Sequence, residues 1–180
     1  SIVEKADVRL FNLENVLSDR AIYASTYCGG TWLLAKEDTL DDTLSFGFNG
    51  CSFANNHTMD CREQGMRDTL DIAAQNGVAT LGAGMCKKDA ARIVELPGSG
   101  GIGLFSVTYY RDFLKAGEDT PGCITCDDLE TIQKNISEIK SRNRWCVMVV
   151  HDGGEFSNMP MPFFRRRYLK YLEMGADVIV

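Results

Sequence analysis

Both histidines of the chain lie where an apolar segment gives way to polar residues. His57 belongs to the run 55–60 (Asn-Asn-His-Thr-Met-Asp), and His151 follows the apolar run 147–150. Each apolar run has the length and composition of a buried strand. Because the carboxyl ends of parallel strands collect ligands and catalytic groups in α/β sheets, the two strand exits predict one common site.

The polar run 55–60 could instead cap a following helix, since Asn and Asp often accept hydrogen bonds from the first helical amides. Capping requires one such side chain, whereas this run offers several. Asparagine oxygens and imidazoles bind hard or borderline divalent ions, and a carboxylate such as Asp60 or Glu63 could orient the His57 ring. This run therefore offers Asn55, Asn56, His57 and Asp60 as candidate site residues.

The surroundings of His151 favour a functional role over a simple bond to backbone. Asp152 and Glu155 flank it, and the glycines between them permit close approach of a ligand. Asn12 and Glu14 alternate onto one side of the strand expected at 8–14. Asn12, Glu14, His151 and Glu155 are therefore further candidates for binding a metal ion or a substrate.

Composition bounds the class of protein. A length of 180 residues with 44% hydrophobic content suits one domain with a sizeable core. The net charge of −6, with Arg165–Arg167 as the one basic cluster, argues against nucleic-acid binding. We expect that triplet to be a solvated helix face, with phosphate binding as the alternative. The apolar runs are shorter than the roughly 20 residues that a membrane span requires.

Cysteine usage favours free thiols in a reducing compartment, because the seven cysteines lack the regular spacing of a disulfide scaffold. This favours a cytoplasmic location, and association with the cell envelope is the alternative. Cys123 and Cys126 have the spacing of a redox pair or half of a zinc site, but no second pair follows.

Periodicity and turn residues predict an α/β fold with mixed sheets flanked by helices. The segments 51–54, 60–77 and 78–81 predict a βαβ unit, and helices are expected at 37–47, 127–144 and 162–175. The glycine-rich turn 97–101 predicts a hairpin between strands 91–96 and 102–107, which would make the sheets mixed. Because a strand follows, the glycines at 98–103 do not match a dinucleotide-binding turn.

Five segments in order resemble one family. They are 6–14, ending in Asn-Leu-Glu; 54–60, followed by Gly65 and Leu70; 77–84; 151–155 (His-Asp-Gly-Gly-Glu); and 175–179. Together they resemble the bacterial capsule synthesis family, the CapA-type proteins of poly-γ-glutamate synthesis. The resemblance spans nearly the whole chain, and the ordered set is more specific than any single motif.

The resemblance implies a branch of the calcineurin-like metallophosphoesterases, with two sheets packed face to face, helices outside and a two-metal site at the strand exits. Glu14 would then hold the bridging-carboxylate position, Asn56 and His151 metal-ligand positions, and His57 the general-acid or phosphate-contacting position. Taking the residues and the resemblance together, we expect catalytic roles for His57 and Asp60, metal binding by Glu14, Asn56 and His151, and substrate contacts from Asn12, Asn55 and Glu155. The implied cofactor is a divalent metal (Mn, Zn or Fe) in the full-length protein. It would polarise a phosphoryl group and generate hydroxide.

The chain departs from the family pattern at its ends and at Asp152, where the family often has tryptophan. The family's Gly-Asp strand would precede Ser1 and its Gly-x-His-x-His segment would follow Val180, so we expect an inactive fragment of a single domain, truncated at both ends. An exposed sheet edge there would favour homo-oligomers.

Three functions follow as hypotheses. In the first, the full-length protein is a metal-dependent hydrolase or transferase in cell-envelope polymer metabolism, acting on an anionic polymer or a phosphorylated small molecule. In the second, it is a non-catalytic polymer-binding or assembly component of capsule synthesis or export. The glutamate at position 14, in place of a bridging aspartate, favours this second hypothesis. A third reading, a structural domain without a site, requires the polar strand exits to be capping and turn chemistry only.

Overall fold

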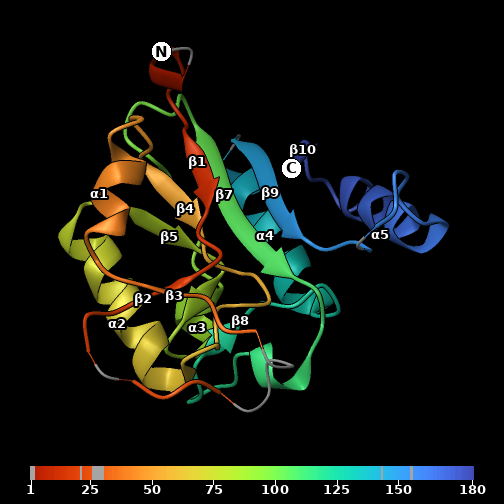
Figure 1. Ribbon diagram of the computed structural model, residues 1–180. Coiled ribbons are helices and arrows are strands. Elements are labelled where there is room, and N and C mark those ends of the chain that lie inside the picture. Colours follow the sequence, from red (N-terminus) through yellow and green to blue (C-terminus); the bar gives the residue numbers. More distant parts are fainter. Residues whose placement is uncertain (1–2, 21, 26–30, 143, 155) are drawn as a thin grey trace.

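Two three-stranded parallel sheets form the centre of the computed structural model, which describes residues 3–20, 22–25, 31–142, 144–154 and 156–180. The first sheet has the order β1 (Leu10–Asn12), β4 (Gly50–Ser52), β5 (Ala79–Leu81). The second has the order β10 (Val178–Ile179), β9 (Trp145–His151), β7 (Ile102–Thr108). In Figure 1 the arrowheads of β1, β7 and β9 point towards the same side of the molecule.

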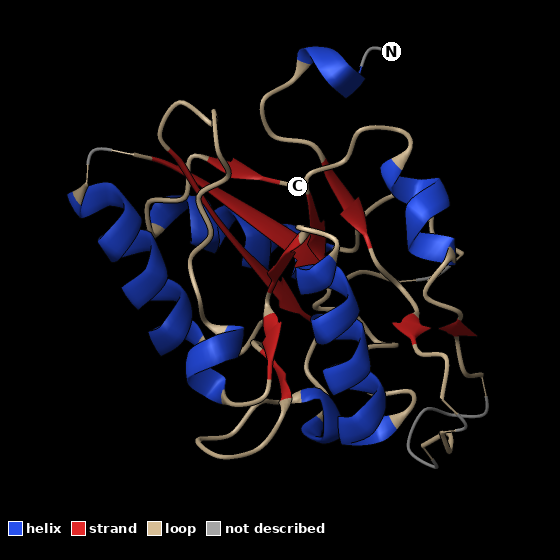
Figure 2. Ribbon diagram, turned by 90° about the vertical axis from the view of Figure 1, so that its left-hand side faces the viewer, coloured by secondary structure: helices blue, strands red, loops and turns tan. Residues whose placement is uncertain are grey.

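Helices cover the outer faces of both sheets, as Figure 2 shows. Helix α2 (Arg62–Gln75) packs on the first sheet through a cluster that includes Met66 and Ile72. Helices α4 (Leu129–Ser141) and α5 (Pro162–Glu173) pack on the second sheet, where Ile132, Ile136, Ile139 and Tyr171 are buried. Short helices occupy Thr39–Leu44 (α1) and Lys87–Ala90 (α3), with 3₁₀ turns at Val3–Lys5 and Asp112–Leu114.

Alternation along the central strands explains the layering. In β4, Cys51 belongs to the cluster under α2, whereas Ser52 Oγ lies 2.6 Å from Ser106 Oγ of the other sheet. In β7, Leu104 packs between the sheets and Phe105 lies in the cluster under α4. Successive strand residues point to opposite faces, so each strand serves both an inner and an outer contact. The order is therefore helix, sheet, sheet, helix, which confirms the α/β expectation.

Two small sheets complete the fold. β2 (Val16–Leu17) pairs in parallel with β3 (Leu34–Ala35). β6 (Ala83–Gly84) pairs with β8 (Gly122–Cys123) in the antiparallel sense. The sheet system is mixed because of this last pair.

The expected hairpin at 91–107 is reduced to a single bridge. Val94 and Leu104 exchange two backbone hydrogen bonds of 2.8 Å, but residues 91–96 do not form a strand. Helix α3 reaches Ala90 and is capped at Ala91, which leaves a short stretch before the turn. Val94 and Leu96 instead pack between the two sheets, so hydrophobic contact rather than a ladder fixes the segment.

The crossover from β4 to β5 confirms the predicted βαβ unit, since β4 and β5 pair in parallel. Gly77 ends this unit's helical region with φ +70°, a backbone conformation that favours glycine. Helix α2 begins at Arg62 with Cys61 at its N-cap, and no side chain caps it. The polar run 55–60 is therefore not used as the helix cap.

Gly82 permits the close approach of the two sheets at the end of β5. Its φ is +78°, and a Cβ there would lie 2.5 Å from the carbonyl oxygen of Ser106. A side chain would force that carbonyl away, so the absence of a side chain at Gly82 allows the two backbones to lie close together at the strand exit.

The described cysteines are free, and most are buried. Burial raises the pKa of both Cys123 and Cys126 to about 12. Thiols held in the protonated form are poor nucleophiles and metal ligands, so these two cysteines pack as small hydrophobes. Among the described helices, none has the length and apolar character required to cross a membrane.

Candidate functional site

A cavity of about 790 Å³ opens at the carboxyl ends of the central strands. Glu14, Asn56 and His57 line it from the side of the first sheet, and His151 lines it from the end of β9. The two sheets contribute their strand exits to the same space because their strands run towards the same side (Figure 1). The convergence predicted for residues 14, 56, 57 and 151 is thus present in the structure.

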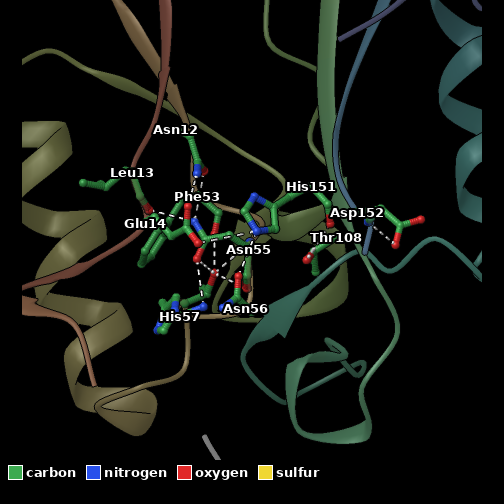
Figure 3. A network of polar contacts seen from close by, with 12 residues as sticks. Asn12, Leu13, Glu14, Phe53, Asn55, Asn56, His57, Thr108, His151 and Asp152 are labelled. Atoms are coloured by element: carbon green, nitrogen blue, oxygen red, sulfur yellow. Dashed lines mark hydrogen bonds and ion pairs between the residues drawn. The ribbon is translucent and has the colours of Figure 1, made fainter. Parts of the chain in front are cut away.

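Asn56 and His151 meet directly across the two sheets. Asn56 Oδ1 lies 2.8 Å from His151 Nε2, and Glu14 Oε1 lies 3.7 Å from the same nitrogen. Figure 3 shows the three side chains pointing toward one another. They present an amide oxygen, a carboxylate oxygen and an imidazole nitrogen, a donor set suited to a divalent transition metal.

The Glu14 carboxylate is held by a chain of asparagines. Asn55 Nδ2 donates to Leu13 O at 2.7 Å and to Asn12 Oδ1 at 3.3 Å. Asn12 Nδ2 in turn donates to Glu14 Oε2 at 2.7 Å. One carboxylate oxygen is therefore tied to Asn12, and the other, Oε1, is the one nearer His151. Supporting hydrogen bonds of this kind orient ligand side chains in metal sites.

Asn55 itself is fully buried, and its Oδ1 accepts a hydrogen bond from the His57 amide at 3.0 Å. Its side chain shapes the loop that carries Asn56 and His57, and it does not line the cavity. Asn12 likewise contacts Glu14 and Asn55 and lies outside the cavity lining. The structure thus places both asparagines behind Glu14 and the loop.

His57 is oriented by a buried carboxylate. Its Nδ1 lies 2.7 Å from Asp60 Oδ2, which also accepts a hydrogen bond from the Leu33 amide at 2.7 Å. Asp60 is fully buried, so it acts on the cavity only through His57. Because Nδ1 is engaged, Nε2 is the ring atom left to act in the cavity. Glu63, the alternative partner, pairs with Arg67 at 2.9 Å instead.

Burial lowers the pKa of His151 below its ordinary value of 6.5, against the opposing effects of Glu14 and Asp152, which raise it. A lower pKa keeps the imidazole neutral at neutral pH. Neutral imidazole is the form that binds a metal ion.

Asp152 pairs with Arg167 of α5, and its side chain is almost fully buried. The Arg167 guanidinium also lies 4.5 Å from the centroid of the Phe163 ring. The pair fixes α5 against the residue that follows His151. Arg167 is thus half-buried and paired, whereas Arg165 and Arg166 are exposed, so the solvated-face interpretation holds for those two residues alone. Glu155, expected to contact substrate, lies outside the described residues.

One wall of the cavity was not anticipated from the sequence. Tyr109, Tyr110 and Arg111 follow β7 and line the cavity together with the predicted residues. The segment 109–126 reads as an irregular insertion, and an isolated arginine in such a segment gives no signal. The parallel pairing of β7 with β9 could have placed it, because Thr108 is in register with His151.

Metal binding depends on how many donors converge. Among the described residues, no group of three His, Cys, Asp or Glu side chains is arranged to hold a metal ion. Glu14 and His151 are two such donors, and the amide oxygen of Asn56 supplies a third. Three donors of this kind fit an open site that leaves coordination positions for water or substrate.

Comparison with known proteins gives the family. The family described as bacterial capsule synthesis protein PGA_cap matches residues 1–180. The chain belongs to this family. The resemblance inferred from the ordered motifs is thereby confirmed.

Curated members support the same assignment. The chain is 32% identical over 151 residues to the PGA biosynthesis protein CapA of Bacillus subtilis, covering 82% of this chain and 40% of that protein. It is 28% identical over 155 residues to the capsule biosynthesis protein CapA of Bacillus anthracis, covering 82% of this chain and 37% of that protein. The chain thus spans about two fifths of the length of these relatives.

Proposed function

We propose that the full-length protein carrying this sequence is a metal-dependent phosphoesterase-like hydrolase or transferase of capsular polymer biosynthesis. The similarity to two capsule or PGA biosynthesis proteins supports the process. The observation that carries the chemistry is the meeting of Glu14 Oε1, Asn56 Oδ1 and His151 Nε2 beside a carboxylate-oriented histidine. Its substrate is an anionic polymer or a phosphorylated small molecule.

Glu14, Asn56 and His151 are the residues that would hold a divalent ion such as Mn, Zn or Fe. Such an ion, when bound, polarises a phosphoryl oxygen and lowers the pKa of a bound water. The asparagine pair behind Glu14 keeps its Oε1 turned to the donors, so the site is oriented before the ion binds.

His57 supplies proton transfer. Asp60 holds Nδ1, so Nε2 can give a proton to a leaving oxygen or contact a phosphoryl oxygen. Asp60 is a positioning residue, since its burial keeps it from substrate. Glu14, which lines the same cavity, carries no such proton-transfer role in this scheme.

The test is phosphodiester turnover. Full-length protein would be assayed with bis(p-nitrophenyl) phosphate in Mn²⁺ or Zn²⁺, beside His57→Ala and the exposed control Glu63→Ala. We expect His57→Ala to lower turnover by about 100-fold or more, the range of general acid–base catalysis, and the control to match wild type. Equal turnover in wild type and His57→Ala would remove this assignment.

A second candidate is a non-catalytic polymer-binding or assembly component. The observation that favours it is that, among the described residues, no three His, Cys, Asp or Glu side chains converge to hold a metal ion. Its signature is affinity for an anionic polymer that chelation of metal leaves unchanged, together with no turnover in the assay above.

A further inference from the structure

The wall formed by Tyr109, Tyr110 and Arg111 faces the same cavity as the metal-donor residues. Its backbone is tied to the site. The amide of Tyr109 donates to the carbonyl oxygen of His151 at 3.0 Å, and Thr108 Oγ1 donates to the same oxygen at 3.3 Å. The wall therefore has a defined position relative to His151.

The other side of Arg111 is also anchored. Its carbonyl oxygen accepts a hydrogen bond from the Leu114 amide at 3.0 Å, and Leu114 is fully buried. Arg111 is thus an exposed side chain on a backbone fixed at both ends. Because the backbone is already fixed, only the side chain has to be ordered when a ligand binds, which reduces the entropic cost of binding.

The Arg111 guanidinium is held by stacking rather than by a carboxylate. Its Cζ lies 4.9 Å from the centroid of the Tyr109 ring, and Nη1 donates to Tyr110 O at 3.3 Å. Within the described part of the chain no ion pair involves Arg111, whereas Arg167, the other arginine of the cavity, is paired with Asp152. Stacking on a ring leaves the in-plane N–H groups available to an oxyanion.

We propose that Arg111 recognises an oxyanion of the substrate, a carboxylate or a phosphate, at a point separate from Glu14, Asn56 and His151. The inference rests on the proposed function and adds a specificity-determining residue to it. With an ion at the donors, the cavity would carry two separate positive centres. Its substrates are then molecules with at least two oxyanionic groups, one at each centre. Arginine suits this role because its planar fork matches both carboxylate and phosphate.

The experiment is calorimetric binding to full-length protein in the presence of Mn²⁺. The probes are a short γ-linked oligoglutamate, the same oligomer with its free carboxyl groups amidated, and inorganic tripolyphosphate. The variants are Arg111→Gln, Arg111→Lys and the control Arg166→Gln, an exposed arginine of α5 that does not line the cavity. Mn²⁺ affinity and phosphodiester turnover are measured on the same preparations.

We expect Arg111→Gln to weaken binding of a charged probe on the order of 10-fold, the effect of losing a charge-assisted hydrogen bond at an exposed site. Arg111→Lys should restore part of that affinity, and Arg166→Gln should bind as wild type does. The amidated oligomer should bind equally to all proteins. Selective loss of oligoglutamate identifies a carboxylate, and selective loss of tripolyphosphate identifies a phosphate.

The inference is overturned if Arg111→Gln binds both charged probes as wild type does, or if it loses the amidated oligomer equally. The two proposals fail separately. If the protein neither binds Mn²⁺ nor turns over the phosphodiester, but Arg111→Gln selectively loses a charged probe, the hydrolase proposal is rejected and the oxyanion site is kept. Normal turnover without an Arg111 effect would reject the oxyanion site alone.

Discussion

His151 Nε2 and Asn56 Oδ1 lie 2.8 Å apart although His151 ends β9 of the second sheet and Asn56 follows β4 of the first. The distance between them is therefore set by how the sheets pack. Between the sheets, Ser52 Oγ and Ser106 Oγ are 2.6 Å apart and fully buried, and Gly82 lies against the same Ser106. A change at this contact should be felt at the site as well as in stability.

Gly82→Ala tests how tightly the two sheets pack at this contact. The new Cβ would lie 2.5 Å from Ser106 O at a residue whose φ is +78°. We expect a loss of about 2–4 kcal/mol in the free energy of unfolding, from overpacking and the left-handed backbone together. Gly77→Ala is the control, because its φ is +70° but nothing lies within 4 Å of the new Cβ, so only about 1–2 kcal/mol is at stake. Equal losses in urea unfolding would mean that the sheet contact is not tight.

Asp60→Asn tests the orientation of His57. Asp60 Oδ2 accepts from both His57 and Leu33, and an amide cannot accept both with the same strength. If the protein is the proposed hydrolase, kcat should fall roughly 100-fold because the ring loses its orientation and charge stabilisation. KM should change little, since Asp60 is buried away from substrate. Glu63→Gln is the matched control, and an Asp60→Asn kcat at the wild-type level would contradict the role.

Asp177 should make stability depend on pH in acid. The Cys146 amide donates to its Oδ2 at 2.7 Å and Lys140 Nζ lies 2.8 Å away, which together hold the pKa of Asp177 below its ordinary 3.8. Because the folded pKa is lower than the unfolded one, the stabilisation is fully present above about pH 4 and is lost as pH falls through the folded pKa.

The measurement is urea unfolding of wild type and Asp177→Asn between pH 2 and pH 7. The variant should be less stable at neutral pH, and the difference should shrink towards pH 2. Asp71→Asn, at an exposed position of α2, should show no such trend. A stability difference for Asp177→Asn that stays constant with pH would contradict the assignment.

The core of the candidate site was predictable because it follows from strand direction. His57 and His151 each follow an apolar run, and parallel strands end at a common edge. The strand expected at 8–14 is shorter in the structure, where β1 ends at Asn12 and Glu14 lies two residues beyond it. The predicted proximity of Asn12 and Glu14 is nevertheless present, since Asn12 Nδ2 donates to Glu14 Oε2 at 2.7 Å. The family resemblance added the role of each residue, which spacing alone does not supply.

Other contacts between segments distant in sequence gave no signal in the sequence. Leu33 is bonded to Asp60 by a backbone amide, which carries no side-chain signal. Successive residues of a helix point about 100° apart. Arg167 therefore pairs with Asp152, while Arg165 and Arg166 face water. The strand expected at 91–96 does not form, because Val94 and Leu96 are held by hydrophobic contacts between the two sheets.

The most direct test of a shared metal site is a calorimetric titration of the full-length protein with Mn²⁺. It compares wild type with Glu14→Gln, Asn56→Ala and His151→Ala. Glu63→Gln serves as control. We predict that all three substitutions affect the same Mn²⁺ site and that each weakens Mn²⁺ affinity at least about 10-fold, since even supporting residues of metal sites contribute that much. Three variants that bind Mn²⁺ as tightly as wild type would contradict a shared ion site at the meeting of the two sheets.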